Sequence, residues 1–136
     1  MHLKIDHIGI AVRSLKDAIR IYSAGLDFKV AIIEEVADQS TRVAMLPIGE
    51  SRLELLEPSG DDSPVAKFIT KRGEGMHHIC VSVENITQAI GQLKAAGARM
   101  IDETPRPGAN GCLVAFVHPS STCGVLIELA QAGGNH

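Results

Sequence analysis

The alternation of apolar and polar residues begins near the N-terminus, over residues 4–12. Ile8, Ile10 and Val12 recur at every second position, and His7 lies on the other side of the alternation beside small neighbours. A period of two with one apolar side predicts a β-strand. Because the other residues on the His7 side are small, they do not fill the space that the His7 side chain faces.

The spacing then becomes helical. Ser14 is a plausible N-cap, and Gly25 ends the predicted helix. Its apolar positions are Leu15, Ala18, Ile19 and Tyr22. Three further strands are predicted at 28–33, 42–47 and 52–58, with a polar connection at 34–40 and a turn at 48–51. The first half of the chain therefore has the order β-α-β-β-β.

The two halves are joined by residues 59–73. Ser63 and Pro64 form an N-cap followed by proline at the first helical position, which predicts a short helix through about Arg72. Gly73 ends it.

The second half repeats the first at a fixed offset. His78 aligns with His7 at 78 − 7 = 71, and apolar residues coincide along both strands and helices. The predicted elements are strand 78–83, helix 86–96 with Asn85 as cap and Gly97 as stop, segment 99–102, a Pro/Gly-rich loop at 104–111, and strands 112–117 and 125–130. We predict one α+β domain over residues 1–136 made of two tandem βαβββ modules. Module 1 covers about 3–58, the linker helix about 59–73 and module 2 about 75–131.

Composition excludes several classes of protein. The 136 residues are 45% apolar and 21% charged, with a net charge of −3, no Trp and no basic block, so nucleic-acid binding and membrane association are not expected. The first residues lack the apolar core of a signal peptide. Three cysteines without paired spacing suit a reducing compartment, and we expect a cytoplasmic protein.

Each half carries a histidine where its first strand begins and a glutamate within its last strand. Glu54 and Glu128 each lie between two apolar residues, so alternation directs both to the face of His7 and His78. Packing of the modules about a pseudo-twofold axis would let the four side chains converge. Two imidazoles and two carboxylates suit Mn, Co, Ni, Fe or Zn and leave positions for water or a chelating substrate.

Each of these four residues, taken alone, could be an ordinary surface residue. The recurrence of the same two residue types at equivalent positions of both halves favours a shared metal site. His77 aligns with Asp6 rather than with His7, so we assign it to the surroundings of the site or the surface. Cys80 shares the face of His78, and a packed thiol is the simplest interpretation. His118 precedes an ordinary turn. Lys67, Lys71 and Arg106 are candidates for binding substrate phosphates, against the simpler role of solvated surface residues.

Several motifs resemble a known family. The paired modules and Asp6-His7-Ile8-Gly9-Ile10-Ala11-Val12 are similar to the vicinal oxygen chelate (glyoxalase/bleomycin resistance/dioxygenase) superfamily. The stretches 62–69, 73–79, 105–109, 116–119 and 124–129 resemble the methylmalonyl-CoA epimerase family in particular. The similarity covers about residues 3–131.

The resemblance implies a divalent metal, cobalt or manganese first and nickel or zinc next, held by His7, Glu54, His78 and Glu128. It implies metal-dependent epimerisation of (2R)/(2S)-methylmalonyl-CoA by 1,1-proton transfer through a metal-stabilised enolate. We expect Glu128, as a carboxylate at the metal, to be one proton-transfer residue and Glu54, its counterpart in the repeat, to be the other. Many family members carry Gln where this chain has Glu54, and some carry a second acid on the strand at 42–45, where the register puts Arg42. The second acid of those family members therefore has no acidic counterpart at Arg42 of this chain.

Two other functions remain open. One is a glyoxalase I-like lactoylglutathione lyase, because glyoxalase I often carries Glu at the position of Glu54. The other is a non-catalytic small-molecule-binding protein of the same fold. The resemblance also implies an acyl-CoA substrate and a homodimer.

Overall fold

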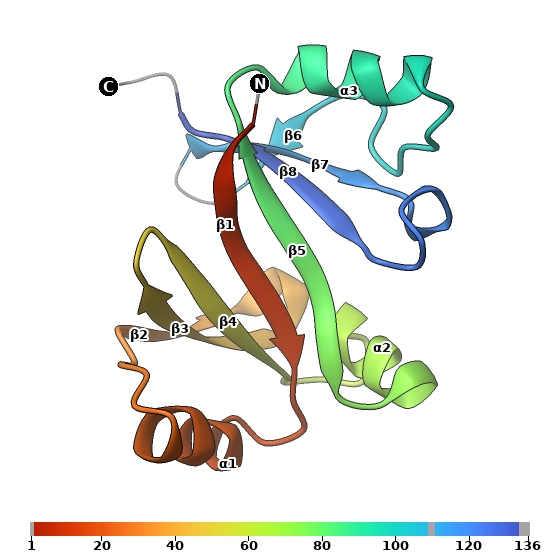
Figure 1. Ribbon diagram of the computed structural model, residues 1–136. Helices are drawn as coiled ribbons and strands as arrows, with labels where there is room; N and C mark the ends of the chain where they lie inside the picture. The colour runs from red at the N-terminus through yellow and green to blue at the C-terminus, as the bar shows by residue number, and fades with distance from the viewer. Residues whose placement is uncertain (1, 109–110, 134–136) are drawn as a thin grey trace. The chain divides into compact units, whose positions relative to one another are not determined.

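The computed structural model describes residues 2–108 and 111–133. Within these ranges the chain has eight β-strands and three α-helices. It divides into two compact units, one of residues 7–77 and one of the residues up to 6 together with those from 78 onward. Figure 1 labels the elements of both.

The first unit contains a four-stranded sheet in the order β2-β3-β4-β1. Its elements are β1 (His2–Ala11, from His7 onward in this unit), α1 (Leu15–Ile19), β2 (Ile32–Val36), β3 (Thr41–Ile48), β4 (Ser51–Pro58) and α2 (Pro64–Arg72). β1 runs parallel to β4, and the other neighbours are antiparallel. A π-helical segment (Arg20–Gly25) continues α1, and a 3-10 turn (Ala37–Gln39) precedes β3.

The two faces of this sheet have different coverings. On one face, α1 packs over a core that includes Val12, Leu46 and Leu55. On the other face, α2 covers one end only, where its Val65 and Ile69 join a core that also contains Ala11, Val43 and Leu56. Because side chains alternate along β1, His7 projects to the face that α2 partly covers.

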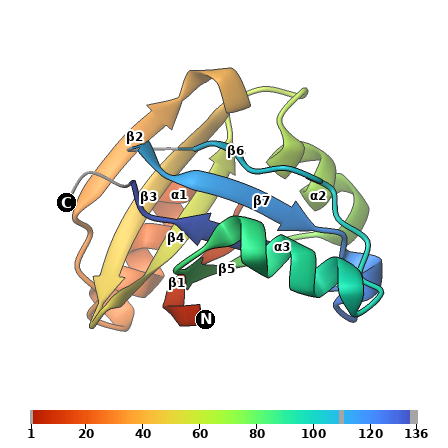
Figure 2. The same ribbon diagram turned by 90° about the horizontal axis from the view of Figure 1, so that it is seen from above.

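The second unit repeats this arrangement with the strand order β5-β8-β7-β6. Its elements are β5 (Gly75–Val83, from His78 onward in this unit), α3 (Ile86–Ala95), β6 (Arg106–Pro107), β7 (Leu113–Val117) and β8 (Ile127–Gln131). β5 is parallel to β8, and the other pairs are antiparallel. Figure 2 shows α3 beside β7 and β8, where Ile86, Ile90 and Leu129 are core residues.

The predicted α+β fold with two βαβββ modules is therefore confirmed. The three predicted N-caps are also confirmed: Ser14 accepts from the Asp17 amide, Ser63 from the Val65 amide and Asn85 from the Gln88 amide. Among the described residues, every helix falls short of the length and apolarity that a bilayer-spanning helix needs.

The prediction of a strand at 28–33 followed by a polar connection at 34–40 is wrong. The strand is β2, Ile32–Val36. Phe28 and Val30 instead pack into the core under α1 without strand structure. β2 is an edge strand that pairs with β3 alone, so two adjacent glutamates are tolerated in it with their carboxylates in solvent. β6 and an isolated bridge from Met100 to Val117 were not predicted as pairings.

Candidate active site

The first unit brings His7 and Glu54 together on one face of its sheet. Glu54 lies opposite Gly9 in the parallel pairing of β1 with β4, so its side chain is next to that of His7. The His7 Nδ1 atom is 3.6 Å from Glu54 Oε2. Both residues are buried, with 7% and 9% of their surfaces exposed. Burial at this level is incompatible with the simple alternative of a solvated alternation position for Glu54.

Arg52 completes this group, and it was missed at the sequence level. Its Nε donates a hydrogen bond of 2.8 Å to Glu54 Oε2, and its Nη2 lies 2.8 Å from the same oxygen. Nη2 is also 3.4 Å from His7 Nδ1. A buried carboxylate is costly unless it is paired and hydrogen-bonded, and Arg52 meets that need. The signal was present, because residues two apart on a strand share a face.

The second unit brings His78 and Glu128 together in the equivalent way. Glu128 lies opposite Cys80 in the parallel pairing of β5 with β8, just as Glu54 lies opposite Gly9. The His78 Nε2 atom is 3.4 Å from Glu128 Oε1. His78 is buried and Glu128 is half-buried. Cys80 is fully buried, as predicted for a packed thiol.

Aromatic and basic groups surround this second pair. Phe116 lies opposite Glu128 on β7, and its ring is edge-on to the His78 ring at 6.3 Å between centroids. The Arg106 guanidinium lies over the Phe116 ring at 5.5 Å, and its Nε donates to Asp102 Oδ1 at 3.1 Å. The candidate substrate residue Arg106 is thus one aromatic ring away from the His78–Glu128 pair.

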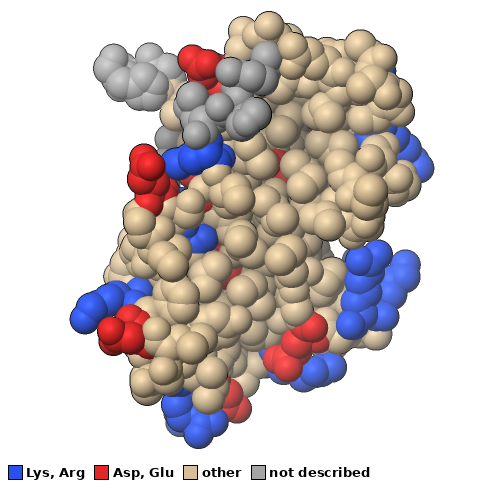
Figure 3. Space-filling model, in the orientation of Figure 1, with Lys and Arg blue, Asp and Glu red and all other residues tan. Residues whose placement is uncertain are grey.

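The other substrate candidates, Lys67 and Lys71, are exposed on α2. Figure 3 shows basic side chains gathered over this helix, and elsewhere on the same face acidic and basic groups are interspersed. α2 packs over the apolar end of the sheet face, where Ala11 lies, and not over the end of His7. A role for the two lysines stays a prediction.

The remaining polar candidates have local partners. His77 is half-buried and lies edge-on to Phe68 at 4.9 Å between ring centroids. His118 accepts from the Ser120 amide at 3.0 Å and so caps a 3-10 turn, which agrees with an ordinary turn.

Arg42 does not lie on the face of Glu54. In the β3–β4 pairing, Arg42 is opposite Glu57, and its Nη1 is 2.7 Å from Glu57 Oε1. The β3 residues on the face of Glu54 are Thr41, Val43, Met45 and Pro47, and none carries a carboxylate. The expectation that Arg42 occupies the position of a second acid is therefore wrong by one residue, which is enough to change the face.

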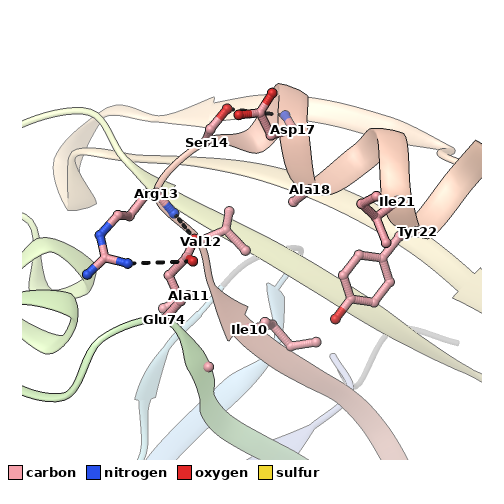
Figure 4. Close-up of a pocket in the computed structure, with 11 residues that line it drawn as sticks. Ile10, Ala11, Val12, Arg13, Ser14, Asp17, Ala18, Ile21, Tyr22 and Glu74 are labelled. Carbon is pink, nitrogen blue, oxygen red and sulfur yellow. Dashed lines mark hydrogen bonds and ion pairs between the residues drawn. The ribbon is translucent and has the colours of Figure 1, made fainter. Parts of the chain in front are cut away.

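Each unit also has a hollow between its helix and its first strand. The hollow of the first unit has a volume of about 540 Å³ and is bordered by Ile10, Tyr22 and Glu74 (Figure 4). The second, about 460 Å³, is bordered by Val81 and Leu93, which are the repeat equivalents of Ile10 and Tyr22. Because Ile10 alternates with His7, the first hollow opens on the opposite face of the sheet from the His7–Glu54 pair.

The donor atoms of both pairs fit a divalent metal. Each pair supplies an imidazole and a carboxylate, the ligand types that suit Mn, Co, Ni and Zn. Ligand bonds of about 2.1 Å allow two atoms on one ion to be up to about 4 Å apart, and the separations of 3.6 and 3.4 Å fall within this limit. Each pair thus fits half of the predicted four-ligand set.

Known proteins resemble this chain over nearly its whole length. The model of the glyoxalase/bleomycin resistance protein/dioxygenase superfamily matches residues 6–116. An uncharacterised protein of Bacillus subtilis is 41% identical, over 97% of this chain and 94% of that protein. The mitochondrial methylmalonyl-CoA epimerase of Bos taurus is 38% identical, over 95% of this chain and 74% of that protein.

The fold agrees with these relatives. A solved methylmalonyl-CoA epimerase in complex with methylmalonyl-CoA and NH4+ superposes with a TM-score of 0.87 at 36% identity, covering 98% of this chain and 97% of that one. Together with the repeated His–Glu pair in each unit, these similarities confirm the predicted family: the chain belongs to the glyoxalase/bleomycin resistance protein/dioxygenase superfamily and, within it, to the enzymes of the methylmalonyl-CoA epimerase family.

Proposed function

We propose that this protein epimerises (2R)- and (2S)-methylmalonyl-CoA by proton transfer at the carbon between the thioester and the carboxylate. The observation that carries the proposal is the buried pairing of a histidine with a glutamate at equivalent positions of both units. Repetition of the same two residue types supports one shared function for them. Family membership supports the substrate.

His7, Glu54, His78 and Glu128 are the residues that would hold a divalent metal, with cobalt or manganese as the first candidates. When bound, such a metal supplies Lewis-acid stabilisation of negative charge that develops on the thioester oxygen. The half-buried and buried positions of the four side chains limit the access of water, which strengthens electrostatic interactions within the site.

Inversion of a carbon centre requires one group that removes a proton and another that delivers a proton to the opposite side. We assign these roles to Glu128 and Glu54, because a carboxylate is a competent general base and the pair is related by the repeat. The β3 residues that share the face of Glu54 are Thr41, Val43, Met45 and Pro47, so β3 supplies no acid next to it. This supports Glu54 over a residue of β3 as the partner of Glu128.

Arg106 is the candidate that best fits a role in binding the anionic substrate. Its guanidinium is held by Asp102 and by the Phe116 ring, and that ring contacts His78. A cation so placed, at the rim of the His78–Glu128 pair, suits a carboxylate or phosphate group of an acyl-CoA. Lys67 and Lys71 offer exposed positive charge of the same kind.

An assay with two substrates tests the proposal. Protein reconstituted with Mn²⁺ or Co²⁺ is expected to convert (2S)-methylmalonyl-CoA to the (2R) form and to leave the hemithioacetal of glutathione and methylglyoxal unchanged. Turnover of the hemithioacetal alone would instead establish a lyase, which the Glu54 carboxylate leaves as the second candidate. Absence of both activities together with undetectable metal binding would favour a binding protein of the same fold.

We also infer a homodimer, on the basis of the family alone. Light scattering coupled to size-exclusion chromatography is expected to give twice the chain mass of 14.5 kDa. A mass equal to one chain would contradict this.

A further inference from the structure

Arg52 makes the two His–Glu pairs unequal. In the first unit, its guanidinium contacts both Glu54 and His7. The last strands of the two modules align at 128 − 54 = 74, so the equivalent of Arg52 in the second unit is Leu126. The difference therefore lies in charge, because one pair carries an added cation and the other has an apolar residue at that position.

The contact between Arg52 and Glu54 is close and largely removed from solvent. Two nitrogens of the guanidinium lie at 2.8 Å from a single carboxylate oxygen, Oε2. The side chain of Glu54 is 11% exposed and that of Arg52 is 33% exposed. A pair of this kind is screened much less than a surface pair.

The negative charges of the proposed site require a compensating cation, and Arg52 supplies one. Glu54 and Glu128 contribute two negative charges, and the substrate brings a third in its own carboxylate. The negative charge of Glu54 repels the carboxylate of the substrate unless a nearby cation compensates for it. A divalent metal is attracted by the same negative charge, so a compensating arginine has opposite effects on the metal and on the substrate.

We propose that Arg52 is a positioning and specificity-determining residue that compensates for the charge of Glu54. It lowers the affinity for the divalent cation and raises the affinity for acyl-CoA substrates that carry a free carboxylate on the acyl group. This inference rests on the proposed function. It predicts a pattern of opposite signs that loss of folding cannot produce, because misfolding weakens both interactions.

The experiment compares four variants with the wild type: Arg52→Gln, Arg52→Lys, Glu54→Gln and the double variant R52Q/E54Q. Titration calorimetry of metal-free protein with Mn²⁺ gives the cation Kd, and steady-state kinetics with methylmalonyl-CoA gives KM and kcat. Removal of the Arg52 charge next to Glu54 is expected to lower the Mn²⁺ Kd of R52Q about tenfold. It is expected to raise the KM for methylmalonyl-CoA about tenfold, with a smaller change in kcat.

Two comparisons isolate the charge. Arg52→Lys keeps the positive charge and is expected to stay within about threefold of the wild type in both Kd and KM, since only the forked geometry is lost. In the Glu54→Gln background the positive charge of Arg52 remains, without its partner carboxylate, so removing Arg52 is again expected to lower the Mn²⁺ Kd by at least about tenfold. Arg42→Gln is the matched control, since Arg42 forms an equally short pair with Glu57 on the other face.

An Mn²⁺ Kd that is unchanged or higher in R52Q would overturn the inference, as would an equal effect of R42Q or an Mn²⁺ Kd that the removal of Arg52 leaves unchanged in the Glu54→Gln background. These outcomes differ from failure of the proposed function. In that case the wild type itself binds no Mn²⁺ or turns over no methylmalonyl-CoA, whatever the variants do.

Discussion

Met45 lies directly opposite Glu54 in the antiparallel pairing of β3 with β4. Phe116 occupies the equivalent position opposite Glu128 in the pairing of β7 with β8, and the two residues are 71 apart like the rest of the repeat. Each glutamate therefore has an apolar cross-strand neighbour, but only the second is an aromatic ring. That ring connects the His78–Glu128 pair to Arg106, and the first pair has Arg52 in direct contact instead.

Arg106→Ala is expected to raise KM for methylmalonyl-CoA with a smaller effect on kcat, because Arg106 contacts Phe116 and Asp102 beside the pair and not the proposed proton-transfer groups. An Arg-to-anion contact at a partly exposed position is worth about 1–2 kcal/mol, or about five- to thirtyfold in KM. The effect should shrink at high ionic strength. Lys94→Ala, which breaks an exposed pair with Glu103 in the same unit, is the control. An unchanged KM in Arg106→Ala would remove Arg106 from the substrate site.

If the four residues hold a divalent metal as proposed, its removal is expected to lower the unfolding temperature, because a ligand that binds only the folded state stabilises it. Addition of Mn²⁺ to metal-free protein should raise the temperature again in the wild type and not in His78→Ala. His118→Ala is the matched control, since His118 caps a turn and belongs to neither pair. A Mn²⁺ response that survives in His78→Ala would contradict the assignment of this residue as a ligand.

Ser63→Ala is expected to lower the free energy of unfolding by about 1–2 kcal/mol, the usual cost of losing an N-cap. Ser63 is fully buried, and its hydroxyl also lies 3.3 Å from that of Thr41, so the value should fall in the upper part of this range. Urea denaturation measures the change. A loss below about 0.5 kcal/mol, the scale of ordinary surface substitutions, would show that the cap adds little to α2.

Leu55→Ala is expected to cost about 2–5 kcal/mol, because Leu55 is fully buried in the core beneath α1 and its removal leaves a cavity. Ile48→Ala in the same sheet is the control. Ile48 is 51% exposed, and we expect a change within about 1 kcal/mol of zero. Similar losses in the two variants would contradict the assignment of the apolar core to the Leu55 side of β4.

Strong local signals made much of the fold predictable. The Ser63-Pro64 cap and the Gly73 stop predicted α2 at its observed bounds, because capping depends on residues next to one another. The repeat at 71 predicted the second unit from the first. The apolar residues on either side of Glu54 and Glu128 predicted the faces of both glutamates, since alternation along a strand leaves only two choices.

What could not be predicted depended on contacts between distant segments. β2 was placed too early because Phe28 and Val30 are apolar like strand residues, and only packing under α1 separates them from the edge strand. Arg52 was overlooked because an arginine beside a glutamate is ordinary on an exposed strand. It became informative only when Glu54 proved to be buried.

The central claim is that Glu54 and Glu128 act on opposite sides of one substrate carbon. Exchange of the substrate proton for deuterium in D₂O tests it directly, with each pure stereoisomer and with the variants Glu54→Gln and Glu128→Gln. Both variants are expected to lose epimerisation by about 10²–10⁴-fold. Each should retain exchange, with retention of configuration, for only one stereoisomer, and the two variants should retain it for opposite stereoisomers. Glu103→Gln, an exposed carboxylate, is the control and should behave as the wild type. Full epimerisation in Glu54→Gln, or loss of exchange for the same stereoisomer in both variants, would contradict the claim.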